Sequence, residues 1–159
     1  MRVAVLTLST SRAAGDGDDA SGDLLERFVA ELGGELASRE IVSDERELIE
    51  RRLRDLCDVE RCDLVLTTGG TGVAPRDVTP EATLAVIERE VPGIAEAMRA
   101  ASRPHTKHWM LSRAVAGIRG STLIVNFPGN PRSIDQTAAA IADALPHALA
   151  LIAQAPSEH

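Results

Sequence analysis

The chain has 159 residues, the size of one domain, and its 44% hydrophobic and 26% charged residues are typical of a globular protein with a core. The formal net charge of −7 argues against a broad nucleic-acid-binding surface, which would need a basic excess. No apolar run approaches the ~18 residues of a membrane helix, and strand-like sequence begins at Arg2, which leaves no room for a signal peptide. We therefore expect one cytoplasmic domain over residues 1–159, without nucleic-acid or membrane contacts.

Strand-like and helix-like segments alternate through the first half of the chain. Short aliphatic and β-branched runs predict three strands, at residues 2–8, 35–42 and 62–68. Apolar residues at helical spacing predict a helix that contains Leu24, Phe28 and Leu32 and stops at Gly33-Gly34. The same spacing predicts a second helix over residues 45–57.

The second half of the chain continues this alternation. Thr79-Pro80-Glu81 predicts the start of a helix, with Thr79 as its cap. Prolines and a glycine break residues 91–113 into short helices and loop, and residues 115–119 and 122–127 form a predicted hairpin around Gly120-Ser121. An Ala-rich helix is expected from about 132 to 152, and Pro146 is expected to kink it.

This order of elements indicates an α/β fold. We expect a three-layer sandwich with a mostly parallel sheet, helices on both faces and a late antiparallel hairpin. In such open sheets, ligands bind beyond the carboxyl ends of the strands. Three loops rich in Gly, Pro, Ser, Thr or Asp should lie at that edge, namely residues 9–19, 68–79 and 126–131.

The middle loop begins with the sequence Thr68-Gly69-Gly70-Thr71-Gly72. Its glycines allow a sharp turn that presents backbone N–H groups to an anion, and Thr68 and Thr71 add hydroxyl donors. The alternative is an ordinary tight turn between a strand and a helix. The residues alone do not decide between these two interpretations.

Arg76 and Asp77 follow in the same loop. Arg76 could pair with a phosphate, and Asp77 is a candidate metal ligand or charged positioning group. Asp77 could instead be a solvated carboxylate near the helix start. Because Thr79 is expected to cap that helix, Asp77 is not needed for that task, which favours the functional interpretation.

Asp44 follows the second predicted strand. It could cap the next helix, with Glu47 three residues later completing a capping-box-like pair. It could also lie at the same sheet edge as Asp77, where two carboxylates could hold magnesium against a triphosphate. On spacing alone, the capping role is favoured.

Other candidate motifs are weak. Gly15-x-Gly17-x-x-Ala20 fits a dinucleotide-binding fingerprint in outline, but it contains acidic residues that would repel a pyrophosphate. The phosphate-loop pattern G-x-x-x-x-G-K-[ST] and the G-x-S-x-G nucleophile motif are absent from the sequence, which argues against P-loop and α/β-hydrolase chemistry. Cys57 and Cys62 are expected to be buried thiols, and His105 and His108 to be surface histidines.

Three longer stretches carry a family resemblance. Residues 67–83 read TTGGTGVAPRDVTPEAT, residues 110–120 read MLSRAVAGIRG, and residues 123–131 read LIVNFPGNP. Together they resemble the signature of the MogA/MoaB family of molybdenum-cofactor biosynthesis proteins. The resemblance spans essentially the whole chain, from the first strand to the last helix.

The resemblance implies a molybdopterin adenylyltransferase, which transfers AMP from Mg-ATP to the terminal phosphate of the dithiolene pterin and releases pyrophosphate. It also implies a homotrimer and a downstream protein that inserts molybdate into the activated product. A non-catalytic molybdopterin-binding or scaffold member of the same family is the alternative. A molybdate-inserting enzyme is disfavoured, because that activity usually resides in a longer, multidomain chain, and an unrelated small-nucleotide-binding module is the remaining option.

The resemblance also implies roles for individual residues. Asp44 and Asp77 match the family carboxylates associated with catalysis and magnesium, which raises the functional interpretation of Asp44 above the capping one. The residues implied for molybdopterin and its phosphate are Gly70, Thr71, Gly72, Ser112 and Arg113. The residues implied for the nucleotide side are Asn126, Pro128, Gly129 and Pro131. Two departures from the family pattern are Trp109, where a small residue is more usual, and Phe127, which replaces an aliphatic residue; Trp109 could narrow or line the pterin pocket.

Overall fold

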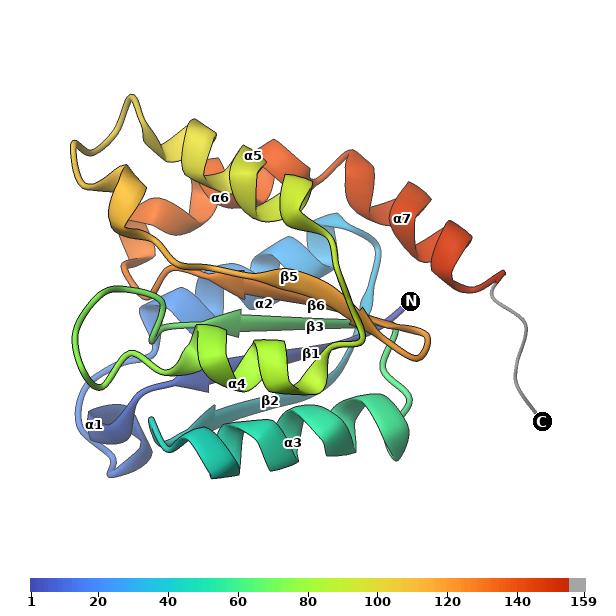
Figure 1. The fold of residues 1–159 in the computed structure, drawn as a ribbon, viewed down its shortest axis with the longest axis horizontal. Coiled ribbons are helices and arrows are strands. Elements are labelled where there is room, and N and C mark those ends of the chain that lie inside the picture. The colour runs from blue at the N-terminus through green and yellow to red at the C-terminus, as the bar shows by residue number, and fades with distance from the viewer. Residues whose placement is uncertain (155–159) are drawn as a thin grey trace.

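The computed structural model describes residues 1–154. Six strands form one sheet in the order β2-β1-β3-β6-β5-β4 (Figure 1). The strands are β1 (Arg2–Leu8), β2 (Glu35–Val42), β3 (Leu64–Thr68), β4 (Arg89–Glu90), β5 (Ala116–Arg119) and β6 (Thr122–Phe127). The pairs of β1 with β2 and β3, and of β3 with β6, are parallel, whereas β5 is antiparallel to β6 and to β4. The predicted mostly parallel sheet with a late antiparallel hairpin is therefore confirmed.

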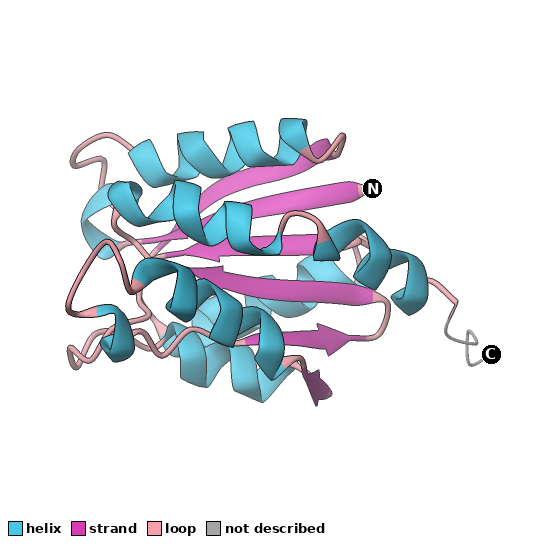
Figure 2. Cartoon of the chain, turned by 90° about the horizontal axis from the view of Figure 1, so that it is seen from above, coloured by secondary structure: helices cyan, strands magenta, loops and turns pink. Residues whose placement is uncertain are grey.

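Helices cover both faces of this sheet. They are α1 (Thr10–Ala13), α2 (Ala20–Glu31), α3 (Arg46–Asp58), α4 (Thr79–Val86), α5 (Pro92–Ser102), α6 (Ile134–Ile141) and α7 (Ala144–Ile152), with 3₁₀ turns η1 (Trp109–Leu111) and η2 (Pro131–Ser133). Apolar side chains of α2, α5, α6 and α7 pack on one face, and those of α3 and α4 pack on the other. Figure 2 shows the strands side by side with helices in front of and behind them, which confirms the three layers. None of the helices in residues 1–154 is both long and apolar enough to cross a membrane.

Successive residues of the central strands point to opposite faces of the sheet. On β1, Val3 and Val5 join the core beneath α2, whereas Ala4 and Leu6 join the core beneath α3. Because both faces are covered, these strands read as continuous apolar runs in the sequence. Phe127 is fully buried at the end of β6, where its ring meets that of Phe28 edge-on with 6.1 Å between the ring centres.

The long C-terminal helix predicted from 132 to 152 is instead three pieces. Residues Pro131–Ser133 form η2, and a break at residues 142–143 separates α6 from α7. Pro146, in the first turn of α7, has no N–H to donate to the carbonyl of Ala142, and its ring would press on that carbonyl. The chain therefore breaks one turn before the proline, so the interruption predicted from Pro146 is present, as a break between two helices and not as a kink within one.

The strands bring four loops to one edge of the sheet, and three of them are the loops predicted to lie there. Thr7 pairs with Thr68, and Thr68 pairs with Phe127, so β1, β3 and β6 end side by side. Leu8 pairs with Val42 at the end of β2. The loops that follow these four strands therefore share the edge where ligands bind in open α/β sheets, as the sequence predicted.

Candidate functional site

A cavity of about 750 Å³ lies at this edge of the sheet. The loops after β1, β2, β3 and β6 all contribute to its lining. Among the lining residues are four of the predicted site residues, namely Asp44, Gly70, Asp77 and Gly129. Parallel strands thus bring together residues as far apart in the sequence as Leu8 and Gly129.

Asp44 is held by the loop after β1. Its Oδ2 accepts hydrogen bonds from the Thr10 N–H at 3.0 Å and from Thr10 Oγ1 at 3.2 Å, and its own N–H donates to Thr10 Oγ1 at 3.1 Å. The N-cap of α3 is Glu45, which makes no side-chain capping bond. The predicted capping role of Asp44 is therefore wrong, because its carboxylate ties the start of α1 to the end of β2 instead.

Asp77 lies across the glycine-rich turn. Its Oδ2 accepts a hydrogen bond from the Ala74 N–H at 3.0 Å. A Cβ added at Gly72 would lie 2.8 Å from Asp77 Oδ2, and a Cβ added at Gly70 would lie 3.4 Å from Asp44 Oδ1. The turn between Gly70 and Gly72 therefore runs close to both carboxylates, and Gly72 leaves the space that the Asp77 side chain occupies.

Thr79 has a different role from the one predicted. Thr79 is the first residue of α4, and the N-cap is Val78. No side-chain hydrogen bond among the described residues caps this helix. The buried Thr79 Oγ1 instead donates to the carbonyl oxygen of Gly69 at 2.9 Å. Gly70 has a φ of +66°, and a Cβ there would lie 2.3 Å from Thr79 Oγ1. The capping prediction is thus wrong because the hydroxyl holds the turn onto the helix.

Two arginines balance the carboxylates of the large cavity. Its lining contains Asp16, Asp44 and Asp77 together with Arg12 and Arg76. Arg76 was expected here from the sequence and Arg12 was not, although Arg12 lies in the polar loop over residues 9–19 that was predicted at this edge. Two planar guanidinium groups beside three carboxylates suit a ligand that carries both phosphates and a divalent cation.

Arg12 is oriented by its own loop. Its Nε donates to the carbonyl oxygen of Asp18 at 2.8 Å, and its N–H donates to Ser9 Oγ at 3.3 Å. The first bond uses one edge of the guanidinium and leaves the Nη atoms without a hydrogen bond to residues 1–154. Arg12 therefore has donors available for a ligand in the cavity.

Arg113 fastens the loop that carries Asp77. Its Nε donates to the carbonyl oxygen of Gly72 at 2.6 Å and its Nη2 to that of Asp77 at 2.7 Å, while Nη1 pairs with Glu81. Its backbone N–H donates to the carbonyl oxygen of Thr71 at 2.8 Å. The Arg113 hydrogen bond lowers the pKa of the Glu81 carboxyl below its ordinary value. The contact predicted between Arg113 and a pterin phosphate stays a prediction, since the guanidinium already serves the loop.

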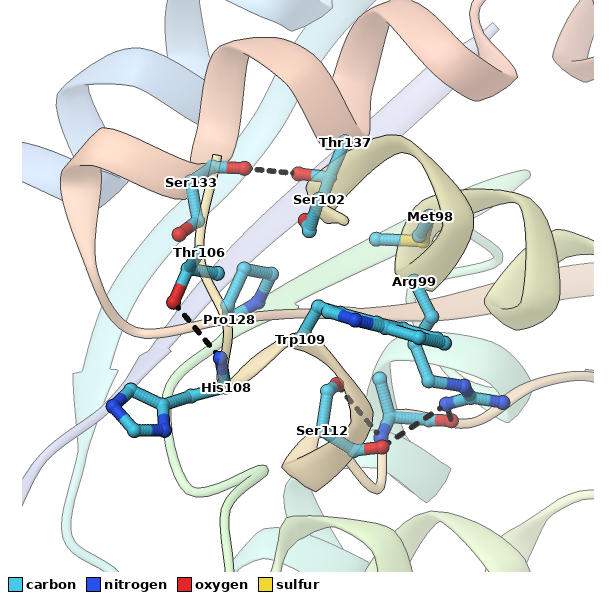
Figure 3. Close-up of a pocket in the computed structure, with 11 residues that line it drawn as sticks. Met98, Arg99, Ser102, Thr106, His108, Trp109, Ser112, Pro128, Ser133 and Thr137 are labelled. Atoms are coloured by element: carbon cyan, nitrogen blue, oxygen red, sulfur yellow. Dashed lines mark hydrogen bonds between the residues drawn. The ribbon is translucent and has the colours of Figure 1, made fainter. Parts of the chain in front are cut away.

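A second, smaller cavity of about 110 Å³ lies between α5, η1 and α6 (Figure 3). Both Ser112 and Pro128 line it, although the family resemblance implies Ser112 for the pterin and Pro128 for the nucleotide. Trp109 also lines this cavity, next to Ser112. The predicted division of the site by sequence segment therefore does not match the way in which the fold groups these residues.

Three further predicted site residues, Asn126, Pro131 and Thr71, lie outside the lining of both cavities. Asn126 is fully buried; its Nδ2 donates to Thr67 Oγ1 and to Thr83 Oγ1, both at 3.0 Å, and its Oδ1 accepts from the Val115 N–H at 3.1 Å. A direct contact between Asn126 and a nucleotide would require this network to open. Pro131 begins η2, and Thr71 is buried with 5% of its surface exposed.

The alternative motifs do not form sites. Asp19 caps α2 by accepting from the Gly22 N–H at 3.1 Å and pairs with Arg39 at 3.2 Å, so the helix end that a pyrophosphate would need is filled by a carboxylate. Cys57 and Cys62 are buried free thiols, as predicted, and burial raises the pKa of Cys57 to about 11. His105 and His108 are exposed, and no group of three or more His, Cys, Asp or Glu side chains in residues 1–154 is placed to hold a metal ion.

The chain is similar to known proteins over most of its length. A family model described as "Probable molybdopterin binding domain" matches residues 4–147. A molybdopterin adenylyltransferase of Helicobacter pylori is 43% identical over 154 residues, 96% of this chain and 88% of that protein. A molybdopterin adenylyltransferase of Escherichia coli K12 is 42% identical over 147 residues, 91% of this chain and 75% of that protein.

Solved structures show the same fold. The molybdopterin biosynthesis enzyme MoaB of Thermus thermophilus superimposes with a TM-score of 0.90 at 44% identity and covers 99% of both chains. A tungsten-cofactor-synthesizing MoaB of Pyrococcus furiosus superimposes with a TM-score of 0.83 at 30% identity, covering 95% of this chain and 96% of that one. The chain therefore belongs to the molybdopterin-binding domain family of the MogA and MoaB proteins, which act in molybdenum-cofactor biosynthesis.

Proposed function

We propose that this protein is a molybdopterin adenylyltransferase that transfers AMP from Mg-ATP to the terminal phosphate of molybdopterin and releases pyrophosphate. One observation carries the proposal: loops from separate strands bring Asp44 and Asp77 to the same cavity as a glycine-rich turn and two arginines. The cavity volume of about 750 Å³ lies within the range of small-molecule sites, ~300–1,000 Å³. The names of the bacterial relatives support the same reaction.

The carboxylates fit a magnesium ion that arrives with the nucleotide. Hydrogen bonds to Asp44 and Asp77 use Oδ2 in each case, and neither Oδ1 accepts a hydrogen bond from residues 1–154. Magnesium commonly takes one or two carboxylates and completes its shell with water and phosphate oxygens, so two free carboxylate oxygens suffice. When bound, the ion supplies neutralisation of the charge that develops on the phosphates.

The rest of the reaction requires positioning more than covalent chemistry. The attacking phosphate oxygen is already an anion, so no general base is required, and oriented donors supply the rate enhancement. We assign Arg12, Arg76 and the backbone N–H groups of the turn at Gly70 to the phosphates. Arg113 acts on the same step by holding the Asp77 loop in place.

The residues implied by the family resemblance complete the proposal. On the pterin side these are Gly70, Thr71, Gly72, Ser112 and Arg113, and on the nucleotide side they are Asn126, Pro128, Gly129 and Pro131. The proposal also includes a homotrimer, a cytoplasmic location and transfer of the product to a molybdate-inserting protein. The homotrimer and the transfer to a molybdate-inserting protein rest on the family resemblance.

The decisive experiment is a direct transfer assay. Purified protein is incubated with molybdopterin, Mg²⁺ and ATP labelled at the α-phosphate, and molybdopterin-AMP and pyrophosphate are measured. The expected result is equal formation of both products, which stops when Mg²⁺ is chelated. Tight binding of molybdopterin with no transfer would refute the enzyme and leave a binding or scaffold protein of the same family.

A further inference from the structure

The cavity of about 110 Å³ beside Trp109 is separate from the large cavity and shares no lining residue with it. Met98, Arg99 and Ser102 come to it from α5, Trp109 from η1, and Ser133 and Thr137 from η2 and α6. In Figure 3 the indole is seen nearly edge-on between Met98 and Ser102 on one side and Ser112 on the other. The cavity is thus a slot with a flat aromatic wall.

A contact with Arg103 holds the Trp109 side chain in this position. The Cζ atom of Arg103 lies 5.9 Å from the centre of its ring, within the range of a cation–π contact. Arg99 holds the following segment, because its Nη1 donates to the carbonyl oxygens of Ser112 at 3.3 Å and Ala114 at 3.0 Å. Trp109 nevertheless stays half-buried and lines a hollow. Its ring surface is therefore available to a ligand.

Hydroxyl groups surround the slot. Thr106 Oγ1 accepts from the His108 N–H at 3.1 Å, and Thr137 Oγ1 donates to the carbonyl oxygen of Ser133 at 2.6 Å. The hydroxyls of Ser102 and Ser133 make no side-chain hydrogen bond with residues 1–154, although Ser102 is only 8% exposed. A flat apolar wall beside free hydroxyls suits a planar ring with polar atoms at its edge.

The size and position of the slot limit further which ligands it can bind. A closed cavity of ~150 Å³ can hold a benzene ring, so a half-open slot of about 110 Å³ takes the edge of a planar heterocycle. Pro128 lines this slot and its neighbour Gly129 lines the large cavity. Thr68 Oγ1 fixes this junction by donating to the carbonyl oxygen of Pro128 at 2.7 Å. A ligand with phosphates in the large cavity can therefore reach the slot with its ring.

We propose that Trp109 and this slot bind the planar nitrogen heterocycle of a phosphate-bearing substrate, with the indole stacked on the ring and the hydroxyls of Ser102 and Ser133 bonded to its edge. This inference rests on the proposed function, which supplies two such rings, a pterin and an adenine. Both share the chemistry that the slot recognises. The experiment therefore has one arm for each ring.

Trp109 is itself the reporter, since the chain has one tryptophan and no tyrosine. Its fluorescence, excited at the red edge of the indole band, is followed while adenosine or neopterin is added, neither of which carries a phosphate. N-acetyltryptophanamide corrects for absorption and collisional quenching, and magnesium tripolyphosphate tests phosphate without a ring. We expect saturable quenching by at least one heterocycle and none by tripolyphosphate, and the heterocycle that quenches identifies the substrate. Quenching by neither ring, beyond that of free tryptophan, overturns the proposal.

Variants then separate stacking from a structural role. Calorimetric titration with the heterocycle that quenches should show affinity reduced by roughly two- to tenfold in Trp109→Ala and largely restored in Trp109→Phe, because a stacked ring pair contributes that much. Met110→Ala is the matched control, since Met110 lies in the same 3₁₀ turn but is 63% exposed and outside the slot. An equal loss in the Met110 variant, or no rescue by Phe, contradicts stacking.

These measurements need no turnover, so they are independent of the transfer assay. If AMP is transferred but neither ring quenches Trp109 fluorescence, the proposed enzyme activity is supported and the inference about Trp109 is wrong. If a ring quenches Trp109 fluorescence but no AMP is transferred, binding of a ring in the slot is supported and the proposed function is wrong.

Discussion

The guanidinium of Arg113 donates from Nη2 to the main-chain oxygen of Asp77 at 2.7 Å, across 36 residues of sequence. Because its Nε simultaneously bonds the carbonyl oxygen of Gly72, one planar group spans the loop that presents the Asp77 carboxylate. A lysine ammonium at this position would keep the charge but could not bridge both carbonyls in one plane. The pair makes the position of Asp77 dependent on Arg113.

Arg113→Lys tests this dependence. We expect a loss of kcat of about tenfold or more, because each charge-assisted hydrogen bond contributes about 1.5–3 kcal/mol and the Asp77 loop loses its anchor. If Arg113 served only as a positive charge for a pterin phosphate, the lysine variant would keep kcat and change mainly the KM for molybdopterin. Steady-state kinetics with each substrate varied separately distinguish these outcomes.

Asp44→Asn separates the carboxylate charge of Asp44 from its structural contact. Asparagine retains an oxygen that can accept from the Thr10 N–H, so stability should fall by no more than about 1 kcal/mol, or ~2–4 °C in melting temperature. Adenylyl transfer should fall about a hundredfold or more and lose its normal dependence on magnesium concentration. Thermal denaturation and the transfer assay are measured on the same preparation. A destabilised variant that is still active would assign Asp44 to structure alone.

Gly72→Ala should displace the Asp77 side chain without unfolding the protein. The added Cβ would lie 2.8 Å from Asp77 Oδ2, which is the end of a flexible side chain that can move aside. We expect activity to fall about tenfold or more, by analogy with the cost of misplacing a positioned group, while the melting temperature changes little.

Gly93→Ala is the matched control for this substitution. A Cβ at Gly93, in the first turn of α5, meets no atom of the described residues within 4 Å. Alanine there should leave transfer unchanged and stabilise the helix by up to about 1 kcal/mol. Full activity in Gly72→Ala would show that the close approach of the turn to Asp77 has no catalytic consequence.

Glu40→Gln tests an ion pair away from the site. Nε and Nη2 of Arg52 bond the two oxygens of the Glu40 carboxylate, while its Nη1 pairs with Glu60 at 2.6 Å. The bonds from Arg52 lower the pKa of Glu40 from its ordinary value of 4.5. A carboxyl whose pKa is lowered on folding stabilises the native state above its unfolded-state pKa, and this contribution disappears as the pH falls through the folded-state pKa. The variant should therefore be less stable than the wild type at pH 7, by up to about 1 kcal/mol for a partly exposed pair.

The pH dependence provides the internal check on this ion pair. Urea denaturation of both proteins at several pH values should give free energies of unfolding that converge as the pH falls through the lowered pKa of Glu40, where the wild-type carboxyl also takes up a proton. A stability difference that stays constant down to acid pH would mean that the variant loses packing and not charge.

The sequence alone determined the layout of the protein. Apolar runs and helical spacing are local properties, and they are sufficient to place β1, β2, β3 and β6 and the helices between them. Once these strands are parallel, their carboxyl ends must meet at one edge, so a shared site for Asp44 and Asp77 follows from the order of elements. The signature stretches identified the family for the same reason, because they are continuous in the chain.

Only the tertiary structure decided which donor meets which acceptor. Thr79 bonds Gly69 and does not cap α4, Asp44 bonds Thr10 and does not cap α3, and Arg113 bonds the loop of Asp77. Each of these contacts joins groups that are distant in sequence, and hydrogen bonds depend on distances of a few tenths of an ångström that no local pattern specifies. The grouping of Ser112 with Pro128 in one cavity has the same origin, since packing of α5 and α6 on the sheet brings two separate loops together.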